Sequence, residues 1–194
     1  MTATTPGGRA PVEHFERLAA GSADPWDYAT SAYEQDKYER TLAALPAHTG
    51  RTLELGCSVG VFTAMLAPRC ESLLAVDFSP TALEHARPRV AGMANVELGR
   101  RTLPEQTPEG PFETIVCAEI LYYWSPPLVR YGLARIENAL APGGTLLAVH
   151  WRGSDPRREL DGDDVHRILR NETRLRWEGG EETADYLLDR WSAT

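Results

Sequence analysis

Short runs of β-branched and aliphatic residues alternate along the chain with stretches that have helical periodicity. The apolar runs predict strands at 51–55, 72–76, 96–98, 114–118 and 145–150. The stretches between them predict helices at 61–67, 79–86 and 128–140. This alternation is typical of an α/β fold built on a parallel sheet.

The last part of the chain adds a different pattern. A helix is predicted around 165–170, followed by apolar runs at 173–177 and 186–191 on either side of a turn at Gly179-Gly180. Two such runs around a glycine turn predict an antiparallel hairpin. The sequence therefore predicts a Rossmann-like sheet that is mostly parallel, with seven strands and an antiparallel hairpin at one edge.

The first part of the chain contains no predicted strand. Helical patterns at 11–20 and 31–45 flank a segment at 21–28 that is rich in turn formers and aromatic residues. Residues 1–10 lack the apolar stretch of a signal peptide, and we expect them to form a frayed tail. We expect one domain, in which residues 1–48 form the tail and a helical lid, and residues 49–194 form the α/β core.

Composition narrows the possible partners. The chain has 194 residues and a formal net charge of −8, which disfavours nucleic acid, because phosphate binding needs clustered basic residues. No apolar stretch approaches the roughly 18 to 20 residues that cross a bilayer, so we expect no membrane partner. With no signal peptide and thiols that we expect to be reduced, we expect a cytoplasmic protein. Three cysteines without a CxxC pair, Cys57, Cys70 and Cys117, predict neither a disulfide framework nor a metal site.

Candidate chemistry follows the first two predicted strands. Glycines at 56 and 60 allow a tight backbone turn after the first strand, whereas Ser58 breaks the glycine spacing of a dinucleotide site. Asp77 ends the second strand, where a carboxylate can accept both hydroxyls of a ribose. This ordered combination predicts a site for an adenosine ligand.

These residues resemble a known family. The segments 54–60 (ELGCSVG), 75–79 (AVDFS) and 140–146 (LAPGGTL) resemble motifs of class I methyltransferases that depend on S-adenosyl-L-methionine (SAM). More narrowly, the segments 24–38, 119–124 (EILYYW) and 150–151 (HW) look like those of the nodulation protein S methyltransferases, which N-methylate an amino sugar of an oligosaccharide. The resemblance covers roughly residues 24–170.

The resemblance implies a place for each part of the cofactor SAM. Glu54 and the turn from Gly56 to Gly60, including Cys57 and Ser58, would hold the methionine end. Asp77 would hold the ribose, and Phe78 would border the adenine. Thr102 stands where such families usually carry an acidic residue for the adenine amine, and Arg100 and Arg101 precede it.

Several aromatic residues are expected at the mouth of the pocket, because aromatic faces suit a cationic sulfonium or amine. They are Trp26, Tyr28, Tyr33, Tyr122, Tyr123, Trp124 and Trp151. Of these, we expect Trp26 and Tyr33 to contact the cofactor and Tyr123 to take part in catalysis. Packing of the core and lid is the alternative role for each ring.

An amine acceptor must lose a proton before it attacks a methyl group, which requires a nearby group that accepts it. Glu119 and His150, at the ends of the fourth and fifth strands, are the candidates, and Glu119 is also a candidate cofactor ligand; a structural role is the alternative for both. His166 is a weaker candidate.

The predicted function is methyl transfer to a small molecule, an amino sugar, oligosaccharide or natural product. O-methylation, an NAD(P)-dependent oxidoreductase and a non-catalytic SAM-binding protein are alternatives. The sequence does not indicate an oligomeric state.

Overall fold

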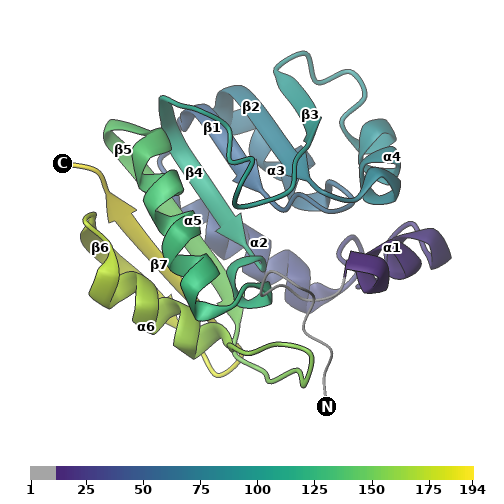
Figure 1. Ribbon diagram of the computed structural model, residues 1–194. Helices are drawn as coiled ribbons and strands as arrows, with labels where there is room; N and C mark the ends of the chain where they lie inside the picture. The colour runs from purple at the N-terminus through teal and green to yellow at the C-terminus, as the bar shows by residue number, and fades with distance from the viewer. Residues whose placement is uncertain (1–11) are drawn as a thin grey trace.

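A computed structural model describes residues 12–194 as a single sheet covered by helices on both faces (Figure 1). The seven strands follow the order β3-β2-β1-β4-β5-β7-β6. Their bounds are β1 Gly50–Leu55, β2 Cys70–Asp77, β3 Val96–Arg100, β4 Phe112–Ala118, β5 Leu140–Trp151, β6 Arg176–Glu182 and β7 Tyr186–Ser192. Strands β1 to β5 pair in parallel, and β7 runs antiparallel to both β5 and β6.

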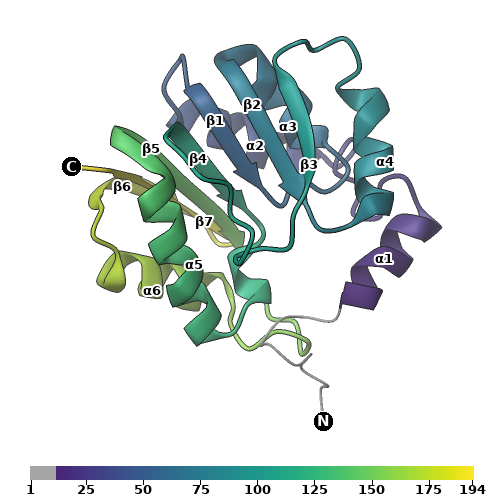
Figure 2. The same ribbon diagram turned by 45° about the horizontal axis from the view of Figure 1, so that its top comes forward.

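The helices divide between the two faces of the sheet. Their bounds are α1 Val12–Gly21, α2 Ala32–Ala44, α3 Val61–Leu66, α4 Pro80–Arg89, α5 Pro126–Ala139 and α6 Gly162–Glu172, with short 3-10 helices η1 Ala67–Arg69 and η2 Leu121–Tyr123. Figures 1 and 2 show α5 and α6 on one face and α2 and α3 on the other.

Each face of the sheet has its own apolar core. On one side, Val129 and Ile136 of α5 and Val165 of α6 pack against strand residues such as Leu53 and Ile115. A second cluster joins α2 and α3 to the opposite face of the central strands. Strands that are buried on both faces explain why their sequences are continuously apolar rather than alternating.

Helix ends are set by capping side chains. The Ser31 hydroxyl accepts the backbone N–H of Glu34 at the start of α2, and the Ser79 hydroxyl accepts that of Ala82 at the start of α4. Asp161 and Asp164 form a reciprocal capping box at the start of α6. Such caps satisfy N–H groups that have no partner inside the helix.

The predicted fold class, a seven-stranded and mostly parallel sheet with an antiparallel pair at one edge, is confirmed. One turn prediction is wrong, because Gly179 and Gly180 lie inside β6 and the chain turns later, at 183–185. A register shift between Trp177 and Gly179 accommodates the glycines within the strand. The expected tail at 1–10 and the predicted first residue of α1, Pro11, lie outside the described residues.

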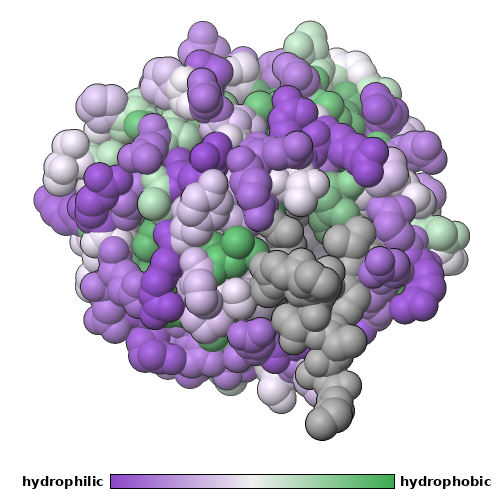
Figure 3. Space-filling view, in the orientation of Figure 1, coloured by the Kyte–Doolittle hydropathy of each residue, from purple (hydrophilic) through white to green (hydrophobic). Residues whose placement is uncertain are grey.

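The surface is charged and mixed. The face in Figure 3 is mostly hydrophilic, and its hydrophobic residues form separate small patches. Within residues 12–194, no helix combines the length and the apolar character required to span a membrane.

Candidate active site

A first cavity, here called the inner cavity, opens where the strand order reverses between β1 and β4. Ligands of doubly wound sheets bind at this position, beyond the carboxyl ends of the strands. The cavity has a volume of about 150 Å³. Its lining comprises Phe15, Ala19, Trp26, Tyr28, Gly56, Ser58, Asp77, Phe78, Ser79, Ala82, Arg101, Thr102, Leu103, Ala118, Glu119, Ile120, Tyr123 and Trp124.

The turn after β1 needs glycine for both conformation and space. Gly56 has a φ of +78°, and a Cβ there would lie 2.8 Å from Cδ1 of Ile120. A Cβ on Gly60 would lie 2.9 Å from the Cβ of Ala86 in α4. The backbone can therefore follow the cavity wall closely only when both positions lack a side chain.

Asp77 ties this turn to the start of α4. Its Oδ2 accepts the N–H of Ser58 at 2.9 Å, and its Oδ1 accepts the N–H of Ser79 at 2.9 Å. Burial raises the pKa of Asp77, while backbone N–H groups of Ser79, Ser58 and Phe78 lower it by favouring the charged form. Each oxygen keeps lone-pair capacity toward the cavity, so the carboxylate can both brace the loops and accept ligand hydroxyls.

Three predicted cofactor residues, Glu54, Cys57 and Gly60, are buried and do not line the inner cavity. Burial raises the pKa of Glu54 to about 7, opposed by the Thr63 hydroxyl. Its Oε2 has no hydrogen-bond partner among the described residues. Burial also raises the pKa of the Cys57 thiol. Glu54 thus has one buried carboxyl oxygen without a partner directly behind the turn.

The expected adenine region lies beside Phe78 and Thr102, which both line the inner cavity. The N–H of Thr102 donates to Oε1 of Gln106 at 2.6 Å. The backbone N–H of Thr102 is therefore already bonded within the protein. A ligand in this region would meet the Phe78 ring and the Thr102 side chain.

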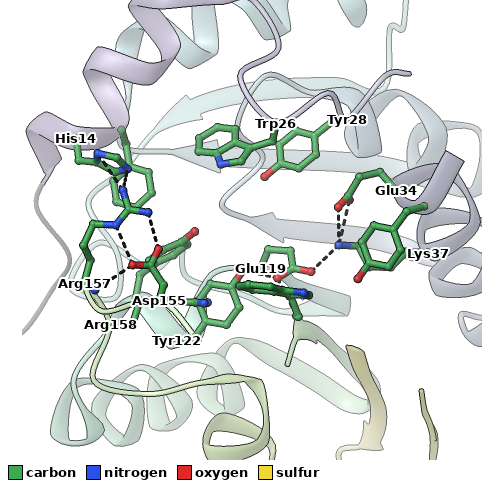
Figure 4. Close-up of a pocket in the computed structure, with 14 residues that line it drawn as sticks. His14, Trp26, Tyr28, Glu34, Lys37, Glu119, Tyr122, Asp155, Arg157 and Arg158 are labelled. Carbon is green, nitrogen blue, oxygen red and sulfur yellow. Dashed lines mark hydrogen bonds and ion pairs between the residues drawn. The ribbon is translucent and has the colours of Figure 1, made fainter. Parts of the chain in front are cut away.

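A second cavity, here called the outer cavity, adjoins the first and has a volume of about 260 Å³ (Figure 4). It is lined by His14, Phe15, Trp26, Tyr28, Tyr33, Glu34, Lys37, Glu119, Tyr122, Tyr123, Trp151, Asp155, Arg157 and Arg158. The two cavities share the boundary residues Phe15, Trp26, Tyr28, Glu119 and Tyr123. A group held at this boundary would face both spaces.

Glu119 is the charged member of the boundary. It has a φ of 55°, which is uncommon for a residue with a side chain. Its Oε1 accepts Lys37 Nζ at 2.7 Å, and its Oε2 accepts the Trp151 N–H at 3.0 Å and the Tyr122 hydroxyl. Three elements of the chain, α2, β5 and η2, therefore fix this carboxylate.

Lys37 is 2% exposed and bridges Glu34 and Glu119. Figure 4 shows its ammonium between the two carboxylates, on the side of the cavity opposite Asp155 and Arg157. Although burial lowers it, the two carboxylates raise the pKa of Lys37 above its ordinary value. Burial raises the pKa of Glu34, against the effect of Lys37.

Aromatic rings form much of the remaining wall. Trp26 and Tyr28 stack with centroids 5.4 Å apart, and Tyr123 packs edge-on against Phe15 at 4.8 Å. Tyr33, predicted to contact the cofactor, lines only the outer cavity. Of the predicted aromatic cluster, only Trp124 lies on the inner cavity alone.

His150 lies outside the lining of both cavities and is fully buried. Its Nε2 accepts the N–H of Leu121 at 3.2 Å, and its Nδ1 is 3.1 Å from Nε2 of His166. Burial and nearby positive groups lower its pKa well below the ordinary value. The ring is positioned to hold the turn after β4 rather than to meet a ligand.

Several lining residues were not singled out as site residues from the sequence. They are His14, Phe15, Glu34, Lys37, Asp155, Arg157 and Arg158. The spacing of Glu34 and Lys37, three apart on a predicted helix, was an available signal for an ion pair. The two arginines lie in a stretch where basic and acidic residues alternate, which is typical of a solvated face, yet Arg158 packs over the Tyr122 ring at 4.0 Å.

Comparison with known proteins agrees with this geometry. The family model described as "Nodulation protein S (NodS)" matches residues 11–154. Nodulation protein S of Bradyrhizobium diazoefficiens is 35% identical over 127 residues, which span 64% of this chain and 61% of the relative. The homologue of Sinorhizobium fredii is 28% identical, over 92% of this chain and 87% of its own length.

A solved structure extends the comparison to the fold. The crystal structure of N-methyltransferase NodS from Bradyrhizobium japonicum WM9 in complex with S-adenosyl-L-homocysteine (SAH) matches with a TM-score of 0.81 and 25% identity. The match covers 93% of this chain and 97% of that one. The chain belongs to the nodulation protein S family of SAM-dependent methyltransferases.

Proposed function

We propose that this chain transfers the methyl group of SAM to the nitrogen of an amino sugar or a related small amine held in the outer cavity. The observation that carries the proposal is the shared boundary, where Glu119 and Tyr123 line both cavities. A cofactor on one side and an acceptor on the other would then meet at a carboxylate and aromatic faces. The name of the B. japonicum structure, an N-methyltransferase, supports nitrogen as the acceptor atom.

The inner cavity suits the proposed cofactor. A Cβ at position 56 would collide with the Ile120 side chain, so the turn leaves a smooth backbone cradle beside the Asp77 carboxylate. Asp77 would hold the ribose, Phe78 would border the adenine, and the backbone from Gly56 to Ser58 would hold the methionine end. SAM supplies an electrophilic methyl group on a positively charged sulfur.

The carboxylates of the outer cavity would bind the acceptor amine and manage its proton. Glu119 has used one bond on Oε1 and two on Oε2, which leaves acceptor capacity toward an amine N–H. Glu34 lies on the same cavity, and because burial raises its pKa, it is suited to take the proton that the amine must lose. His150 enters this mechanism only as support for the turn.

The rings at the boundary would align the reactants and exclude water. Displacement at a sulfonium has a good leaving group, so most of the catalysis comes from holding the nitrogen in line with the methyl group. Trp26, Phe15 and Tyr123 surround the boundary, and their faces favour positive charge. Tyr123 thus contacts both reactants without acting as an acid or base.

The decisive experiment is a methyl-transfer screen against amino sugars, simple amines and the matching neutral sugars, with the site of methylation determined by mass spectrometry and NMR. We expect one methyl group on nitrogen for the amino sugars and none for the neutral sugars. Methylation of hydroxyls alone would replace the proposal with O-methylation. SAH binding without transfer to any acceptor would instead indicate a non-catalytic protein.

One variant tests the proposed proton acceptor. Glu34→Gln is expected to lower kcat by about 10² to 10³, which is typical for loss of a group that moves a proton. Its pH profile should shift so that activity recovers at high pH, where the free amine is already neutral. SAH affinity, measured by titration calorimetry, should stay within about twofold, because Glu34 does not line the inner cavity. A kcat close to that of wild type would remove Glu34 from the mechanism.

A further inference from the structure

A line of three buried polar side chains runs behind the wall of the outer cavity, and the proposed mechanism uses only His150 among them, as support for the turn after β4. His150 is the penultimate residue of β5, His166 lies on α6 and Asp189 lies on β7, and all are 0% exposed. Nδ1 of His150 is 3.1 Å from Nε2 of His166, and Nδ1 of His166 is 2.7 Å from Oδ2 of Asp189. Burial of three ionisable groups is costly unless each has a partner.

Only one arrangement of protons satisfies this line. The N–H of Leu121 can only donate, so Nε2 of His150 must be unprotonated. The single proton of His150 is therefore on Nδ1 and is donated to Nε2 of His166. The proton of His166 is in turn on Nδ1 and is donated to Asp189. Any other neutral tautomer, or a charged ring, would place two donors or two acceptors against each other.

The outer end of the line is fixed by further donors. Nε and Nη2 of Arg170 and Nε1 of Trp177 donate to the Asp189 carboxylate at 2.7 to 2.9 Å. Although burial raises it, hydrogen bonds from His166, Arg170 and Trp177 lower the pKa of Asp189 to about 2. The carboxylate is therefore a permanent acceptor, which orients both histidines from β7 inward.

The inner end of the line holds the turn that carries the boundary residues. The N–H of Glu119 donates to the carbonyl of Val149, and the N–H of Trp151 donates to the Glu119 side chain. His150 adds a side-chain bond to this turn, because its Nε2 accepts the N–H of Leu121, the first residue of η2. The ring of Tyr122 also packs edge-on against that of His150 at 5.2 Å.

We infer that His166 and Asp189 are positioning residues, which act through His150 to hold Glu119, Tyr122 and Tyr123 in the arrangement that receives the acceptor. The inference rests on the proposed role of the outer cavity. The line reaches the acceptor side through Leu121, whereas the turn after β1 and Asp77 lie on other elements. Tyr122 lines only the outer cavity, whereas Glu119 and Tyr123 line both, so loss of the line should weaken acceptor binding more than cofactor binding.

The first test is spectroscopic and needs no acceptor. In ¹⁵N-labelled protein near pH 7.5, the imidazole spectra of His150 and His166, assigned by substitution, should show neutral rings protonated on Nδ1. Free histidine in solution prefers the other tautomer, so the signature is specific. A ring of either residue protonated on Nε2 would overturn the inference, whatever the outcome of the methyl-transfer screen.

The second test separates positioning from stability. His166→Leu removes the acceptor for His150, and we expect the KM for the acceptor to rise about tenfold while the SAH dissociation constant rises much less. His166→Gln can present an amide oxygen to His150 and should recover most of the loss. Leu169→Ala, on the same helix and also buried, is the control that lowers stability without altering the acceptor KM.

Asp189→Asn provides a second route if His166→Leu does not fold. An amide can present its NH₂ group to His166, which would move the histidine protons to Nε2 and oppose the N–H of Leu121. We expect the Nδ1 signature of His150 to disappear and the acceptor KM to rise. An unchanged acceptor KM in a variant whose His150 tautomer has moved would overturn the positioning role.

Discussion

The inner and outer cavities meet at one boundary but are built in different ways. The inner cavity is shaped by backbone, with a glycine turn at the carboxyl end of one strand and Asp77 at the end of the next. The outer cavity is shaped by long side chains from α1, α2 and the segments after β4 and β5, whose charges support one another. Removing a buried charge should therefore destabilise the fold at the outer cavity and stabilise it behind the inner cavity.

The largest effect on stability is expected at Lys37, which neutralises two carboxylates of the outer cavity. Lys37→Met would leave Glu34 and Glu119 facing each other without compensation, which should lower the free energy of unfolding by about 3 to 5 kcal/mol. Urea denaturation would measure the loss. Arg40→Met, on the same helix but in exposed pairs with Asp36 and Glu181, is the control and should change stability little.

Glu54, buried behind the turn that borders the inner cavity, should behave in the opposite way, because removing its charge should raise the free energy of unfolding. Burial raises its pKa to about 7 in the folded chain. Stability from the protonated form is therefore complete below about pH 4.5, its unfolded pKa, and is lost as pH rises through 7. Glu54→Gln should stabilise the ligand-free protein by about 2 to 3 kcal/mol at pH 8 and have little effect at pH 4.5.

Unfolding of both proteins across this pH range would measure the difference. Glu97→Gln, at an exposed position on β3, is the control and should leave the pH dependence unchanged. A Glu54→Gln variant that is less stable than wild type at pH 8 would contradict the contrast between the two cavities.

Asp77 tests the inner cavity as a cofactor site. Asp77→Asn keeps the size of the side chain but loses charge-assisted bonds to Ser58 and Ser79 and one acceptor for the ribose. We expect SAH affinity to fall by about 30-fold, close to 2 kcal/mol. The KM for the acceptor should change much less, and equal changes in both constants would break the separation of the cavities.

Arg158 should show the smallest effect, confined to the outer cavity. Its guanidinium packs over Tyr122, Trp151 and Tyr123, and one Nη donates to the Gly153 carbonyl. Arg158→Leu should raise the acceptor KM about fivefold, since such contacts contribute about 1 kcal/mol. Arg158→Lys, which keeps the charge but not the planar stack, should lie between wild type and Arg158→Leu.

The difference between the cavities also explains why the sequence predicted residues of the inner cavity better than those of the outer cavity. Gly56, Ser58, Asp77 and Phe78 follow strands whose positions are evident from local hydrophobic runs, so the topology brings them to one edge. Lys37 was missed because a charged residue on a helix normally faces water, and its burial depends on Glu119, which is distant in sequence. Side-chain pairing between distant elements has no local signature.

His150 shows the same limit from another side. Its place at the end of a strand correctly suggested proximity to Glu119, but strand position does not specify which way a ring is engaged. Only the packing of α6 against β5 and η2 brings His166 to its Nδ1. Its catalytic role stays a prediction, and the structure favours a supporting one.

The glycine pair in β6 has a consequence for how copies of the protein behave in solution. A Cβ on Gly180 would lie 2.2 Å from Oδ1 of Asp189, so this position of β6 must lack a side chain if the carboxylate is to be buried. The register shift beside Gly179 also interrupts the row of backbone groups that this outermost strand presents. An interrupted edge is a poor template for strand addition, so the same residues help keep neighbouring molecules from joining their sheets.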